Sequence, residues 1–72
     1  MTTTELLFDA SIRLDRAQRD VEIAAIRLNS LVPGAPLRYS VEATRRLRAA
    51  DAELEAARLA YDAAQDQPAR ED

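Results

Sequence analysis

The stretch LNSLVPGAPLRYSVEA (residues 28–43) decides the fold, because it holds the main break in a chain of helix-forming residues. Pro33, Gly34 and Pro36 fall within it, and the one other proline, Pro68, lies near the end of the sequence. Proline lacks the amide hydrogen that a helix interior needs, so one helix must end before this cluster and another must begin after it. On both sides the sequence is rich in Ala, Leu, Arg and Glu, which favour helix.

The chain is therefore predicted to be all-α, a single domain made of an antiparallel two-helix hairpin. We expect an N-terminal cap at 1–2, a first helix at 3–31, a Pro/Gly loop at 32–39, a second helix at 41–66 and a flexible tail at 67–72. Thr2 and Glu5 have the spacing of a capping box, and Met1 with Leu6 fits the hydrophobic staple that often accompanies one. Ser40 is the expected N-cap of the second helix.

Both helices repeat apolar residues every seven positions, with large residues at one heptad position and alanine at the other. If the chain folds back at Ala35 and Pro36, every facing pair joins one large residue to one alanine, which fills a core without voids or clashes. The predicted seam has the layers Leu7–Ala64, Ala10–Tyr61, Leu14–Ala57, Ala17–Leu54, Val21–Ala50, Ala24–Leu47 and Leu28–Ala43. This pattern resembles the Ala-rich antiparallel coiled coil called an Alacoil, a packing motif that implies no function.

The seam leaves several large apolar residues unused. A contiguous exposed patch of such residues usually marks an interface. The predicted partner interface consists of Phe8, Ile12, Ile23, Ile26 and Leu59, beside a strip of small residues at Ala49, Ala52, Ala56, Ala60 and Ala63. We expect either a homodimer, a four-helix bundle with the architecture of the Rop-type hairpin dimers, or contact with another protein. The alternative is that these are scattered surface residues, which are normal in folded proteins.

Three apolar residues in the predicted loop, Val32, Leu37 and Tyr39, are expected to cap the end of the hairpin core. In the alternative, they form an exposed docking tip.

Charge is expected to be uneven, with a basic loop end and an acidic open end. The candidate anion or nucleic-acid tip consists of Arg38, Arg45, Arg46 and Arg48. A small nucleic-acid-binding regulator is therefore the alternative function, although a net charge of −3 is not typical of generic nucleic-acid binders. The simpler interpretation is a solvated face with local pairs such as Glu42 with Arg46.

The composition offers few groups for catalysis. There is no His, Cys or Lys, which excludes Ser–His, Cys–His and Schiff-base nucleophiles. The single glycine excludes a Gly-rich phosphate loop. We expect no catalytic, cofactor-binding or metal-binding residues, and we interpret the acidic pairs Asp51–Glu55 and Asp62–Asp66 as solvated faces. The predicted function is a non-enzymatic protein–protein interaction or assembly module.

The remaining expectations concern origin and location. All 10 basic residues are arginine, a bias typical of GC-rich genomes, which suggests a small structural or accessory protein of an actinobacterium or one of its phages. No run approaches the roughly 18 apolar residues that a membrane-spanning helix needs, so no membrane partner is expected. The expected location is the cytoplasm, or a virion if the gene belongs to a phage.

Overall fold

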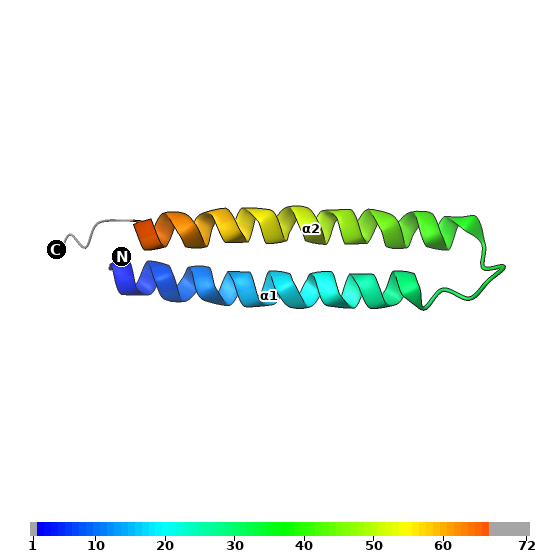
Figure 1. Ribbon diagram of the computed structural model, residues 1–72, viewed down its shortest axis with the longest axis horizontal. Coiled ribbons are helices and arrows are strands. Elements are labelled where there is room, and N and C mark those ends of the chain that lie inside the picture. Colours follow the sequence, from blue (N-terminus) through cyan, green and yellow to red (C-terminus); the bar gives the residue numbers. More distant parts are fainter. Residues whose placement is uncertain (1, 67–72) are drawn as a thin grey trace.

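A computed structural model describes residues 2–66 of the chain as two helices. Helix α1 spans Thr3–Asn29 and helix α2 spans Leu37–Asp66, and the two pack side by side as an antiparallel hairpin (Figure 1). The molecule is a rod with principal extents of 59 × 14 × 13 Å. The start of α1 and the end of α2 lie at its open end, and the connection lies at its loop end (Figure 1). The predicted all-α hairpin is confirmed.

The start of α1 is held by the predicted capping box. The hydroxyl oxygen of Thr2 accepts a hydrogen bond from the Glu5 amide at 3.1 Å, and the Glu5 carboxylate accepts one from the Thr2 amide at 3.1 Å. Two amide groups that the helix itself leaves without partners are thereby satisfied. Met1, the other half of the expected staple, lies outside the described residues, as does the expected tail at 67–72.

The first helix ends at Asn29, two residues before the predicted boundary, because a tight turn closed by Val32 and Ala35 follows it. The Ser30 amide donates to the Ile26 carbonyl at 2.9 Å and closes the helix. The Ala35 amide then donates to the Val32 carbonyl at 3.1 Å. Pro33 and Gly34 occupy the centre of this turn, and Gly34 has a φ of 90°. Proline followed by a residue with positive φ is the signature of a type II turn.

The second helix begins at Leu37, four residues earlier than predicted. The Tyr39 amide donates to the Pro36 carbonyl at 3.0 Å, and the Ser40 hydroxyl donates to the Leu37 carbonyl at 2.9 Å. Ser40 therefore lies inside the first turn, and its prediction as the N-cap is wrong. The helix instead begins directly after Pro36, whose carbonyl accepts the Tyr39 amide within the first turn.

The core is thin and is made of alanine. The buried apolar residues of the described chain are Ala10, Ala17, Ala24, Ala57 and Ala64, all of which belong to the predicted seam. The other seam residues are half-buried. This follows from the architecture, because a two-helix hairpin has no third element to cover the flanks of its contact.

Candidate interaction surfaces

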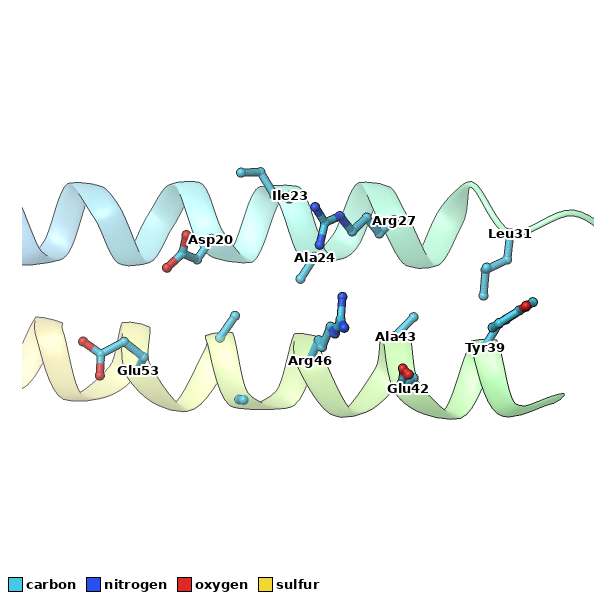
Figure 2. Close-up of a pocket in the computed structure, with 12 residues that line it drawn as sticks. Asp20, Ile23, Ala24, Arg27, Leu31, Tyr39, Glu42, Ala43, Arg46 and Glu53 are labelled. Carbon is cyan, nitrogen blue, oxygen red and sulfur yellow. The ribbon is translucent and has the colours of Figure 1, made fainter. Parts of the chain in front are cut away.

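Figure 2 shows the part of the hairpin near the loop end, where α1 and α2 lie side by side. Leu31 and Tyr39 point toward each other across the pair, and Ala24 lies opposite the turn of α2 that carries Arg46. A chain folded about Ala35 and Pro36 places Ala24 opposite the neighbouring residue, Leu47.

The large apolar residues of α1 that the seam does not use lie on the outer side of the helix, where Ile12 and Ile23 also border depressions lined in part by α2. Phe8 and Ile26 are 63% and 64% exposed, and Ile12 and Ile23 are 40% and 48% exposed. At about 100° per residue, all four fall within roughly 60° of one another and about 180° from the seam. Figure 2 shows Ile23 pointing away from α2. We call Phe8, Ile12, Ile23 and Ile26 the α1 outer stripe.

Leu59, the fifth residue of the predicted interface, lies apart from the α1 outer stripe. It is 62% exposed on α2 and, at five residues from Leu54, sits about 140° around the helix from the seam. The outer face of α2 otherwise carries Val41, small residues such as Ala52, and charges. The predicted interface is thus divided between the two outer sides of the rod, and α1 holds most of it.

A groove of about 540 Å³ follows one side of the hairpin near the loop end. The seam residues Ala24, Ala43 and Ala50 contribute to its lining. Charged side chains of both signs also line it: Asp20, Arg27, Glu42, Arg46 and Glu53. With no dominant charge and an apolar base, the groove has no polar arrangement that would select a particular small ligand.

The four arginines of the candidate anion tip do not converge. Arg46 lines the groove and points toward α1 (Figure 2). Arg45 and Arg48 line a separate shallow depression beside Val41. The Arg38 guanidinium lies 5.2 Å from the centre of the Tyr39 ring, a cation–π arrangement. A phosphate group at one of these places would therefore meet only some of the four charges.

One ion pair within residues 2–66 joins the helices, and it was not predicted from the heptad pattern. The Arg13 guanidinium donates two hydrogen bonds to the Glu53 carboxylate, from Nε at 2.7 Å and from Nη2 at 3.1 Å. These bonds lower the pKa of Glu53 and raise the pKa of Arg13. The sequence does contain a sign of this pair. Arg13 directly precedes Leu14 and Glu53 directly precedes Leu54, and positions that flank the seam in this way meet in antiparallel coiled coils. The expected Glu42–Arg46 pair does not form in this part of the chain.

The apolar residues of the connection do not cap the core. Val32, Leu37 and Tyr39 are 68%, 76% and 48% exposed, so the expectation that they close the end of the hairpin is wrong. The reason lies in the turn at Pro33 and Gly34 and in the early start of α2. Leu37 becomes the first residue of a helix, where its side chain has no neighbouring element to pack against.

Two other classes of site have no counterpart in the described residues. No three His, Cys, Asp or Glu side chains between Thr2 and Asp66 gather closely enough to hold a metal ion. Neither α1 nor α2 contains an apolar segment of the kind that crosses a bilayer. Comparisons with protein-family models, curated proteins and solved structures found no match.

Proposed function

We propose that this chain is a non-enzymatic helical-hairpin module that acts by binding a second protein chain through the α1 outer stripe. The observation that carries the proposal is the exposure of four large apolar side chains on one face of α1. Each such side chain left in water forgoes roughly 1.5–3 kcal/mol of burial. Since α2 packs against the opposite face, the hairpin itself cannot cover them.

The thinness of the core supports the same proposal. Small domains without disulfides or metals commonly gain stability by association. The chain has no cysteine, and its buried core is limited to alanine side chains. A second chain on the outer face of α1 would bury the exposed apolar side chains there and so enlarge the core.

Protein binding is favoured over nucleic-acid binding by the distribution of charge. Arg46 lies apart from Arg45 and Arg48, and the groove beside Arg46 is lined by three carboxylates and two guanidinium groups. Affinity for nucleic acid depends on several cations meeting the phosphate backbone together. The α1 outer stripe, by contrast, combines large apolar side chains on one helix face.

The test places a photo-reactive residue on the stripe. Phe8 is replaced by p-benzoylphenylalanine, and the chain is irradiated in its native host cells. We expect a covalent product between the chain and a second protein, because position 8 would lie inside the contact.

Position 59 provides the matched control, because Leu59 is 62% exposed against 63% for Phe8 but lies on α2. The same residue placed there should give no such product. Absence of a product from position 8, or equal products from both positions, would contradict the proposal.

A further inference from the structure

We infer that the second chain on the α1 outer stripe is another copy of this protein, packed antiparallel about a two-fold axis near residue 17. The inference rests on the proposed function and names its partner. It is carried by the order of residues along the exposed face of α1. The pattern along it is symmetric, with two apolar residues at each end and opposite charges in the middle: Phe8, Ile12, Asp15, Arg19, Ile23 and Ile26, with the exposed Arg16 beside the charged pair.

The apolar residues match one another across such an axis. Phe8 and Ile26 are 18 residues apart, which is about five full turns, so they lie at the same angle around the helix. Ile12 and Ile23 are 11 residues apart, about three turns, and lie on the other side of the stripe. In an antiparallel pair, positions on the same side of each helix meet. Phe8 therefore faces Ile26 of the second copy, and Ile12 faces Ile23 of the second copy.

The charges in the middle of the stripe select the antiparallel direction. Asp15 and Arg19 are both exposed, and neither forms an ion pair in the described part of the chain. About an axis near residue 17, Asp15 meets Arg19 of the second copy, and the symmetry repeats the contact. A parallel pair would instead oppose Asp15 to Asp15 and Arg19 to Arg19, and like charges facing each other across an interface disfavour association.

The ends of the two hairpins also complement each other in this arrangement. Arg27, near the loop end, comes beside the acidic start of α1 in the second copy, where Glu5 and Asp9 lie. The result is a layered assembly in the order α2, α1, α1, α2. It differs from a Rop-type bundle, in which both helices of each hairpin contribute to the dimer contact.

The size of the contact limits its strength. The stripe covers about five helical turns, roughly 27 Å, and only one helix wide. Stable complexes bury roughly 800 Å² per partner, and an interface of a single helix face is at the low end of that scale. We therefore expect a reversible dimer whose population rises across micromolar to millimolar concentrations.

The experiment is a charge exchange followed by sedimentation equilibrium on the purified chain. Two copies of Asp15→Arg would oppose the introduced arginine to Arg19, and two copies of Arg19→Asp would oppose the introduced aspartate to Asp15. We expect each variant alone to dimerise at least about tenfold more weakly than the unaltered chain. An equimolar mixture of the two should recover the association, because every contact then joins opposite charges. The double variant Asp15→Arg/Arg19→Asp should recover it as well.

Arg58→Asp and Asp62→Arg serve as matched controls. They change the net charge by the same amounts, and both residues are exposed on α2 with the same spacing of four. Neither should alter the dimer. Circular dichroism establishes that each variant is folded, which is expected because all four positions are exposed.

Three results would overturn the inference: a chain that is monomeric up to millimolar concentration, single variants that dimerise like the unaltered chain, or a mixture no stronger than its components. The proposed function fails separately. If the purified chain stays monomeric while position 8 cross-links to a protein of different mass, the second-copy inference falls and the proposed function stands. If position 8 gives no product, the proposed function falls.

Discussion

The two helices have similar lengths and share one seam, but they differ on the faces that point away from it. Outward from the seam, α1 carries the four large residues of the outer stripe, whereas α2 carries mostly alanine and charged residues. Their starts differ too, because α1 has a capping box and α2 has no acidic residue in its first turn. In the proposed assembly, α1 is therefore contacted on two sides and α2 on one.

The seam offers the strongest way to break this comparison. Ala17 on α1 is 1% exposed and Ala57 on α2 is 0% exposed, so neither position has room for a larger side chain. Replacing either with leucine should cost about 1–3 kcal/mol of unfolding free energy, because the helices must move apart. Urea denaturation measures the loss. Ala52→Leu, on the exposed outer face of α2, is the control and should be nearly neutral; an equal loss there would argue against the seam.

The turn between the helices should give the next largest effect. Gly34 has a φ of 90°, a conformation that residues with a side chain rarely adopt, although nothing lies within 4 Å of an added Cβ. Gly34→Ala should therefore cost about 1–2 kcal/mol through backbone strain alone. Asparagine tolerates positive φ better, so Gly34→Asn should cost less. Thermal unfolding of the two variants compares them, and an equal melting temperature for alanine and asparagine would speak against strain.

Substitutions at the starts of the two helices should have smaller effects on stability and compare the two helices directly. Thr2→Ala removes the side-chain acceptor of the capping box and should cost about 1 kcal/mol. Ser40→Ala removes a hydroxyl that bonds only within the first turn of α2, so it should leave stability nearly unchanged. Both variants can be measured by urea denaturation monitored by circular dichroism. A larger loss for Ser40→Ala than for Thr2→Ala would restore Ser40 as the cap.

The smallest effect is expected from the bridge between the helices. Because the pKa of Glu53 is lowered in the folded state, the Arg13–Glu53 pair stabilises the hairpin above the ordinary pKa of a glutamate. That stabilisation disappears as the pH falls through the lowered pKa. Glu53→Gln should slightly lower the melting temperature at neutral pH and change nothing at strongly acidic pH. Glu55→Gln is the control, and 1 M salt should shrink the difference because both partners are half-exposed.

Much of the fold could be read from short-range pattern. The capping box needed only Thr2 and Glu5 at the right spacing, and the break needed only the proline and glycine cluster. The start of α2 was placed wrongly because two local preferences competed. Ser40 favours a cap, but a turn that closes on the Pro36 carbonyl lets the helix start earlier, and the earlier start gains an additional turn.

The candidate site was harder to predict from the sequence, because it consists of residues that the packing of the two helices leaves exposed. Sequence periodicity identified Phe8, Ile12, Ile23, Ile26 and Leu59 as surplus to the seam, and all of them are exposed. It did not show that Leu59 lies on the other side of the rod, or that Arg46 lies apart from Arg45 and Arg48. Those facts depend on how each helix is turned about its own axis.

From the sequence alone came the two helices, the bend between them and the set of residues that packs inward. These follow from spacing along one chain, which sets the angle of each side chain around its helix. Only the tertiary structure decided that the large seam residues stay half-buried beside buried alanines, that Val32 and Leu37 stay in solvent, and that Arg13 reaches Glu53. Such features arise when two helices settle at one distance and one rotation, and no single helix contains that information.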